Sequence, residues 1–229
     1  MTTTDSNINQ LFNNLDAWRH LPAYQLERRA DIFFSLYLAE VLKEHKNLDL
    51  KGELSIIPEF PIRYGTVSEA PNVKEIFPEL FGNSGENQSF KIDYLVARVD
   101  GKSACFVELK TDNSSISSNQ ILYMNAARVS DLGTLVTGLA SILTASNAKG
   151  KYRTLLKQTE HMKDWNVKPT NVFILPRQPA EVKLKELHEA TIITFDQFAD
   201  VVEKHPDYLS LRFAKSLREW AKDIAGSPK

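Results

Sequence analysis

The sequence predicts a three-layer α/β/α sandwich with a mixed central sheet, because stretches of helical and strand periodicity follow one another in a characteristic order. That order is helix, strand, strand, strand, helix and then a later strand. The 229 residues, 42% of them hydrophobic, provide enough apolar side chains for a sizeable core. No repeat or linker interrupts the chain, so we expect one domain over 1–229, with a core at about 24–176 and a helical C-terminal part at about 195–225.

The chain begins without a clear pattern and then enters a long helix. Residues 1–10 carry no apolar periodicity and are expected to be loose, and 11–21 can form a short helix. Between 24 and 45, apolar residues recur at the spacing of an amphipathic helix. This long helix is the first element of the predicted core.

Three stretches of strand character follow, at 54–63, 90–99 and 103–109. The dipeptide Asp100-Gly101 between the last two is a strong hairpin signal. The segment 65–87 holds three of the nine glycines and two prolines, and it is expected to be a long excursion between the first two strands.

The pattern after the third strand is mainly helical. Helices are predicted at 119–129, 132–146, 151–165 and 206–225. Two short apolar runs, at 171–175 and 191–194, are expected to be strands.

The charge and the cysteine content indicate in which cellular compartment the protein is expected and which partners are disfavoured. With 28 Lys and Arg against 29 Asp and Glu, the net charge of −1 provides no basic field toward nucleic acid or membrane. The single Cys105 cannot form an intramolecular disulfide, and the polar N-terminus lacks the regions of a signal peptide. The longest charge-free run, 132–148, is too short and too polar to span a bilayer. We therefore expect a cytoplasmic protein outside the membrane, whose C-terminal helix packs against its core or a second copy.

Asp93, Glu108 and Lys110 carry the most informative chemistry in the chain. Side chains alternate along a strand, so Glu108 and Lys110 point to one face. The tight hairpin brings residues equally far from the turn side by side, which places Asp93 opposite the region of Glu108. Two carboxylates and a lysine should therefore meet at the end of an apolar strand.

This arrangement predicts a divalent metal site. Charges at the end of an apolar strand are costly unless paired or metal-bound, and two hard oxygen ligands with open positions suit Mg²⁺ or Mn²⁺. Such a metal can polarise a phosphoryl oxygen and activate a water, while the lysine orients or stabilises the attacking hydroxide. A surface salt bridge at a strand end is the alternative interpretation, because exposed ion pairs are common.

The strings Ile92-Asp93 and Phe106-Val107-Glu108-Leu109-Lys110, followed by a helix, resemble the signature of the PD-(D/E)XK phosphodiesterase superfamily, the restriction-endonuclease-like nucleases. The resemblance covers 24–128 and 171–175, and it implies a restriction-endonuclease-like αβββαβ core. It also implies a metal held by Asp93, Glu108 and the carbonyl of Leu109, with Lys110 positioning the nucleophile. Ile92 stands where the name of the motif has proline.

Family members often add an acid on the first core helix. Since the first strand ends at the site and the helix runs opposite to it, the N-terminal end of helix 24–45 should lie over the site. Glu27 is therefore the expected acid, with Asp31 next, and Glu40 is disfavoured because it lies about 20 Å farther at 1.5 Å per residue. The helix dipole alone also favours an acid at this end, which is the alternative explanation for Glu27.

Members often add a glutamine on the second helix as well, and Gln120 is the expected residue here. Tyr123 lies three residues farther on the same face of that helix, whereas some family members carry this pair at a spacing of four. A core position is the alternative for Tyr123. Cys105 falls on the strand face opposite Glu108 and is expected to be a buried small side chain.

A nucleic-acid substrate needs cationic contacts. A local basic strip offers them: Lys149, Lys151, Arg153 and Lys157 are the expected contacts, and Lys163 and Lys168 continue the strip. A solvated helix face is the alternative explanation for this strip. The leading hypothesis is a Mg²⁺- or Mn²⁺-dependent nuclease that hydrolyses phosphodiester bonds in DNA. The alternatives are a nuclease for RNA or a small phosphodiester, and a non-catalytic nuclease-fold module that binds nucleic acid or a protein partner.

Overall fold

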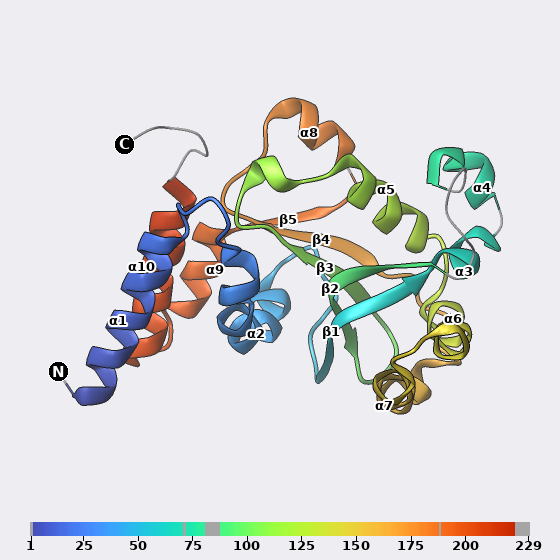
Figure 1. Ribbon diagram of the computed structural model, residues 1–229, viewed down its shortest axis with the longest axis horizontal. Helices are drawn as coiled ribbons and strands as arrows, with labels where there is room; N and C mark the ends of the chain where they lie inside the picture. The colour runs from blue at the N-terminus through green and yellow to red at the C-terminus, as the bar shows by residue number, and fades with distance from the viewer. Residues whose placement is uncertain (1, 71, 81–87, 188, 223–229) are drawn as a thin grey trace. The chain divides into compact units, whose positions relative to one another are not determined.

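The computed structural model describes residues 2–70, 72–80, 88–187 and 189–222 (Figure 1). The chain is α/β, with 55% of it helical and five strands in one open mixed sheet of order β1-β2-β3-β4-β5. The predicted α/β class with a mixed sheet is confirmed. The chain forms two compact units, one of 1–48, 109–116 and 173–229, and one of 49–108 and 117–172, which are described separately below.

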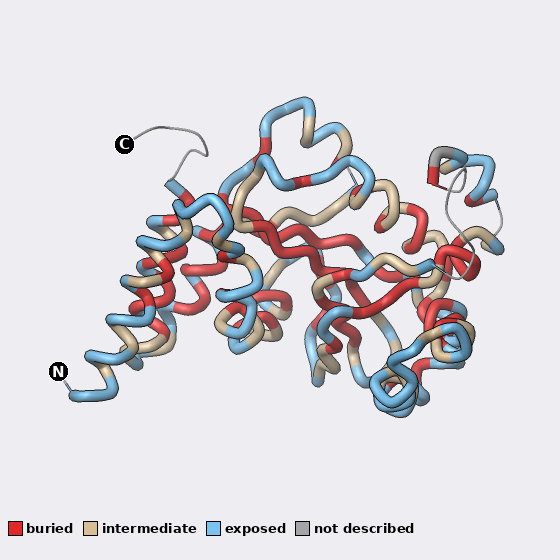
Figure 2. The backbone as a smooth tube through the Cα atoms, in the orientation of Figure 1, coloured by how far each residue is buried: buried red, intermediate tan, exposed pale blue. Residues whose placement is uncertain are grey.

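The second unit contains the antiparallel strands β1 (Leu54–Arg63), β2 (Ser89–Arg98) and β3 (Ala104–Leu109). All three agree with the predicted strands, because alternation and a local turn determine them. The turn holds Gly101 at a φ of 70°, which suits glycine, and a Cβ there would lie 3.0 Å from the Trp165 ring. Every residue of β3 is buried (Figure 2).

The helices of this unit include α5 (Ser118–Ala127), α6 (Leu132–Ala145) and α7 (Lys149–Thr159), the last continued by a 3₁₀ turn at Glu160–Met162. In Figure 1, α5 lies above β1, β2 and β3, while α6 and α7 lie below them. Leu135, Val136 and Leu139 form the buried face of α6, which packs against β1. The part of β4 (Thr170–Leu175) up to Val172 completes the unit.

The predicted excursion after β1 is partly regular. It contains α3 (Tyr64–Ser68), α4 (Val73–Ile76) and a 3₁₀ turn at Pro78–Leu80. The rest of the predicted segment, 81–87, lies outside the described residues. Such one-turn helices are too short to produce a periodic signal, so the sequence pattern did not predict them.

The first unit is mainly helical. It contains α1 (Thr3–Trp18), α2 (Leu26–Glu44), α8 (Glu181–Glu186), β5 (Thr191–Thr194), α9 (Phe195–Val202) and α10 (Tyr208–Lys222). Its core is aromatic, since the Phe34 ring on α2 lies 5.0–5.3 Å from the rings of three phenylalanines, Phe195, Phe198 and Phe213. The predicted helix 206–225 corresponds to α10, and 223–225 lie outside the described residues.

The prediction that residues 1–10 are loose was wrong, because α1 begins at Thr3. The Thr2 hydroxyl accepts from the Asp5 backbone N–H and the Asp5 carboxylate accepts from the Thr2 N–H, which forms a capping box. Farther along α1, Asn9 accepts a hydrogen bond from Arg212 on α10. Polar contacts of this kind leave no regular spacing of apolar residues, so the sequence pattern did not indicate a helix there.

In the described part of the chain, no single helix is both long and apolar enough to cross a membrane. The pair α5 and α6 passes that test only together, with a bend of 110° between the two helices.

Candidate active site

Asp93 and Glu108 occupy neighbouring positions on β2 and β3. The register pairs Val96 with Cys105, Leu95 with Phe106 and Tyr94 with Val107, so its next step pairs Asp93 with Glu108. Directly opposed residues of an antiparallel pair lie on the same face. Glu108 is only 2% exposed and Asp93 is half-buried, so the two carboxylates lie largely out of bulk water.

Gln120 joins these carboxylates from the first turn of α5. Its Nε2 donates to Oε1 of Glu108 at 2.5 Å. We call the carboxylates of Asp93 and Glu108, together with the Gln120 amide, the carboxylate cluster. All three residues belong to the second unit. The glutamine expected on the second core helix therefore does contact the strand carboxylate.

Lys110 and Glu27 meet in the first unit and are called the lysine pair. Lys110 is 5% exposed, and its Nζ lies 3.6 Å from Oε1 of Glu27 in the first turn of α2. The Lys110 backbone N–H donates to the Ile174 carbonyl at 2.9 Å, which ties this residue to β4. The lysine is thus fixed at its backbone and held by an ion pair at its end.

The structure distinguishes the other two acids that were considered on α2. Oε2 of Glu40 lies 2.7 Å from Nε2 of His205, so this carboxylate contacts a histidine and not Lys110. Asp31 is exposed, and its Oδ1 accepts from the Ile32 backbone N–H. Glu27 is the acid beside Lys110, as the direction of the helix predicted; its catalytic role stays a prediction.

The chain connects the carboxylate cluster and the lysine pair through one residue. Leu109, which is buried, joins Glu108 at the end of one unit to Lys110 in the other. A carboxylate and an amine are therefore held two residues apart by the backbone itself.

The donor set suits an oxygen-preferring divalent cation with a mostly open coordination sphere. Within the described ranges, no group of three or more His, Cys, Asp or Glu side chains gathers in a way that could hold a metal ion. Two carboxylates with waters or substrate oxygens fit Mg²⁺, which commonly uses one or two protein carboxylates. A closed all-protein site, as for structural zinc, does not fit.

Tyr123 and Cys105 have structural positions. The Tyr123 ring lies 5.1 Å from Phe90 and 5.4 Å from Tyr64, in an aromatic cluster beside β2. Tyr123 itself is half-buried, so it packs in this cluster without being a fully buried core residue. Cys105 is fully buried, and burial raises the pKa of its thiol, so it is not an available nucleophile.

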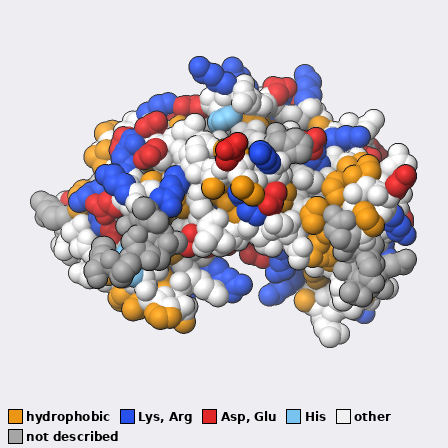
Figure 3. All heavy atoms as spheres, turned by 90° about the horizontal axis from the view of Figure 1, so that it is seen from above, with side chains coloured by type: hydrophobic (Ala, Val, Ile, Leu, Met, Phe, Trp, Pro, Cys, Tyr) orange, Lys and Arg blue, Asp and Glu red, His pale blue; other side chains and the backbone are white. Residues whose placement is uncertain are grey.

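The four expected contacts of the basic strip lie on the exposed surface of α7. Lys149, Lys151, Arg153 and Lys157 are all exposed, and within the described residues no hydrogen bond or ion pair joins them to the carboxylate cluster. On the face drawn in Figure 3, Lys and Arg side chains are interspersed with Asp and Glu. The strip's role in binding nucleic acid stays a prediction.

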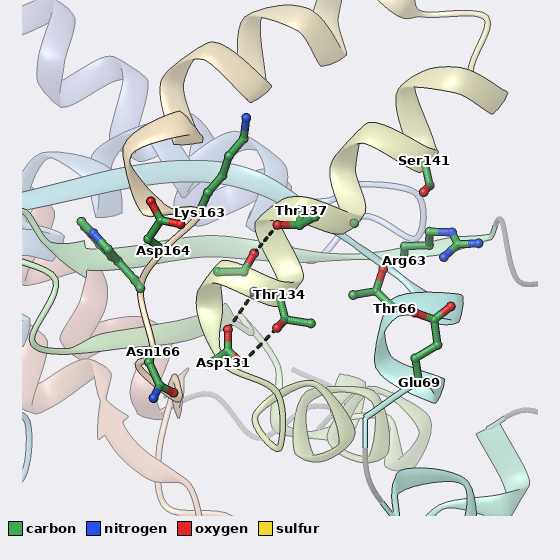
Figure 4. Close-up of a pocket in the computed structure, with 13 residues that line it drawn as sticks. Arg63, Thr66, Glu69, Asp131, Thr134, Thr137, Ser141, Lys163, Asp164 and Asn166 are labelled. Carbon is green, nitrogen blue, oxygen red and sulfur yellow. Dashed lines mark hydrogen bonds between the residues drawn. The ribbon is translucent and has the colours of Figure 1, made fainter.

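A polar groove of about 740 Å³ on α6, in the second unit, was missed by the sequence reasoning (Figure 4). The side of α6 that faces it carries Thr134, Thr137 and Ser141, and Gly133 and Gly138 flank these residues around the helix. These small and polar residues within an otherwise apolar helix were noted only as evidence against a membrane span. Their clustering on one face of the helix is the signal that could have indicated a groove.

No family model, curated protein or solved structure matches the chain.

Proposed function

We propose that the protein is a Mg²⁺- or Mn²⁺-dependent nuclease of the PD-(D/E)XK type that hydrolyses phosphodiester bonds in DNA. The observation that carries the proposal is the hydrogen bond between Gln120 and Glu108, at the strand position that pairs with Asp93. The proposed site thus combines a glutamine with two neighbouring carboxylates, and a lysine follows two residues after Glu108. The restriction-endonuclease-like three-layer arrangement is part of the same proposal.

The burial of these charges supports a functional site. Glu108 and Lys110 are 2% and 5% exposed, in a segment whose other side chains are apolar. Burying a charge costs several kcal/mol, and an apolar pair of similar size is often as stable or more stable. Two carboxylates at directly opposed strand positions also repel each other. A bound divalent cation would remove that repulsion.

Each residue then has a defined task. Asp93, Glu108 and the Leu109 carbonyl would hold the metal, which supplies a polarised phosphoryl oxygen and a water of lowered pKa when bound. Gln120 holds the Glu108 carboxylate in one orientation through its Nε2. Lys110 orients the attacking hydroxide and stabilises charge on the phosphoryl group, and Glu27 positions the Lys110 ammonium.

The test is Mn²⁺-dependent cleavage of linear, circular, single-stranded and branched DNA, and of RNA. Lys110→Ala should lower the cleavage rate by on the order of 10²–10³, the effect of removing one group that stabilises the transition state. Lys102→Ala is the matched control, because Lys102 is an exposed lysine of the same hairpin. Equal rates for wild type and Lys110→Ala would contradict the proposal.

A second candidate function is a nuclease-fold module that binds nucleic acid or a protein partner without cutting. The observation in its favour is that Glu108 and Lys110 are nearly inaccessible and contact partners within the chain. This candidate predicts no cleavage and no Mn²⁺ binding by calorimetry, with nucleic-acid or partner binding unchanged in Glu108→Gln. Mn²⁺ binding that is lost in Glu108→Gln and kept in Glu53→Gln, a change at an exposed acid, would exclude it.

A further inference from the structure

The groove on α6 exists because two glycines let neighbouring segments approach the helix closely. A Cβ on Gly133 would lie 2.3 Å from the Lys163 carbonyl oxygen, and a Cβ on Gly138 would lie 2.2 Å from Oγ1 of Thr66. At about 100° per residue, these glycines are about 140° apart around the helix. Thr137, Ser141 and Thr134 fall between them and form the floor, while the segments of Thr66 and Lys163 form the walls (Figure 4).

The floor presents hydrogen-bond acceptors. The Thr137 hydroxyl donates to the Gly133 carbonyl at 2.8 Å, and the Thr134 hydroxyl donates to Oδ2 of Asp131 at 3.0 Å. Since each hydroxyl has one hydrogen, both oxygens have only lone pairs left to offer a ligand. A ligand on this floor must therefore supply donors.

The walls add acceptors that are not used within the protein. Among the described residues, Glu69 and Asp164 have no ion-pair or hydrogen-bond partner for their carboxylates. Thr66 is 5% exposed and lines the groove, and in the described chain its hydroxyl likewise has no hydrogen-bond partner. Because Thr66 lines the groove, this hydroxyl is available to a ligand there.

Two cationic side chains also line the groove, but both are engaged within the chain. Nζ of Lys163 lies 3.4 Å from Oε1 of Glu160. The Arg63 guanidinium folds over the backbone of Gly65, where a Cβ would lie 2.6 Å from it, and Arg63 has a further interaction within the chain. With three acids, Glu69, Asp131 and Asp164, in the lining, the groove disfavours phosphates and other anions.

We propose that this groove binds a linear polyamine through its alkylammonium groups. Each terminal ammonium carries three donors, the secondary ammonium carries two, and none of them has an acceptor, which matches a lining of carboxylate and hydroxyl oxygens. From Asp131 to Ser141 the helix rises about 15 Å, so an extended triamine can span the groove and reach acids on both walls. The volume of about 740 Å³ accommodates a ligand of this size.

The experiment is calorimetric titration of the full chain with spermidine near physiological salt. Replacing both wall acids, in Glu69→Gln/Asp164→Asn, should weaken binding by about tenfold or more. Glu75→Gln is the matched control, since it removes one exposed charge of the same unit outside the groove and should leave the affinity unchanged. Thr137→Tyr fills the floor from an exposed position and should abolish binding without unfolding the helix.

Three further ligands identify the chemistry. A diol of similar length should not bind if the ammonium groups carry recognition, and inorganic phosphate should not bind at all. A lysine-rich peptide that binds more tightly than spermidine would show that the alkylammonium groups come from a protein, which would overturn the polyamine. No spermidine binding, or equal weakening by Glu75→Gln, would overturn the site itself. Nuclease activity enters none of these outcomes.

Discussion

The two units bury charge in different ways. In the first unit, Arg212 on α10 is 8% exposed and donates to Asp16 on α1 at 2.6 Å, to two asparagines of α1 and to Ser216. Trp220 donates to the same aspartate at 2.8 Å. In the second unit, Asp93 and Glu108 place like charges at neighbouring positions. The contrast is between opposite charges that neutralise each other inside the fold and two neighbouring like charges, for which we propose a metal ligand.

The largest expected effect on stability is at Arg212. Arg212→Met leaves Asp16 without its cationic partner and should lower the free energy of unfolding by about 3 kcal/mol or more. Urea denaturation followed by circular dichroism measures this. Lys215→Met, at an exposed lysine of the same helix, is the control and should change stability by less than about 0.5 kcal/mol. A small effect of Arg212→Met would mean that its hydrogen bonds do not hold α1 to α10.

Two helical glycines, Gly133 in α6 and Gly150 in α7, extend the comparison to the backbone of the second unit. Gly133→Ala would place a Cβ against a backbone oxygen, the Lys163 carbonyl, and should cost about 1–3 kcal/mol because one segment must shift. Gly150→Ala, in α7 with nothing within 4 Å, should instead stabilise by about 0.5–1 kcal/mol. Thermal unfolding of both variants beside wild type is the measurement, and opposite signs are expected. If both variants are stabilised, the close approach that forms the groove is not required.

The stability of the protein at acidic pH tests a charge that stabilises the fold of the first unit. The Ser210 hydroxyl and backbone N–H both donate to Asp207, immediately before α10, and these bonds hold the pKa of that carboxyl below its usual value. A lowered pKa in the folded state adds stability that is present above the unfolded pKa and is lost as the pH falls below about 4. Asp207→Ala should therefore lower the melting temperature at pH 7, and the difference from wild type should narrow toward pH 3.

Asp207→Asn separates the titration from the cap. Asparagine is also a good residue before a helix, so this variant keeps a neutral cap that does not titrate. Its difference from Asp207→Ala should stay constant between pH 7 and pH 3. A wild-type advantage over Asp207→Ala that is equally constant with pH would show that the charge of Asp207 contributes nothing.

Local signals explain what the sequence could predict. Alternation in β1, β2 and β3 and the Asp100-Gly101 turn act over a few residues, so the hairpin and its register from Ala97–Ala104 to Tyr94–Val107 followed from them. The direction of α2 relative to β1 led to Glu27. The start of α1 at Thr3 did carry a local signal, the capping box of Thr2 and Asp5, but apolar periodicity does not detect it. The packing partner Arg212 lies about 200 residues from the residues of α1 that it binds.

The groove was missed for the same physical reason. Its walls come from Thr66 and Lys163, which lie far from each other and from Ser141 in the sequence. A pattern shows that Gly133 and Gly138 share a helix, but not which segments they allow to approach. Contacts of this kind appear only when the elements are packed.

Asp93→Asn is expected to change stability least. This variant tests whether the neighbouring carboxylates of the second unit bind a metal. Removing this charge relieves repulsion with Glu108, so the free energy of unfolding without metal should change by less than about 1 kcal/mol. In wild type, Mn²⁺ that binds only the folded chain should raise the melting temperature with concentration. Asp93→Asn should lose that rise, whereas Asp16→Asn should keep it while being less stable without metal. If the rise persists in Asp93→Asn, the carboxylates of β2 and β3 are not the metal ligands, and like charges there have a purpose within the fold.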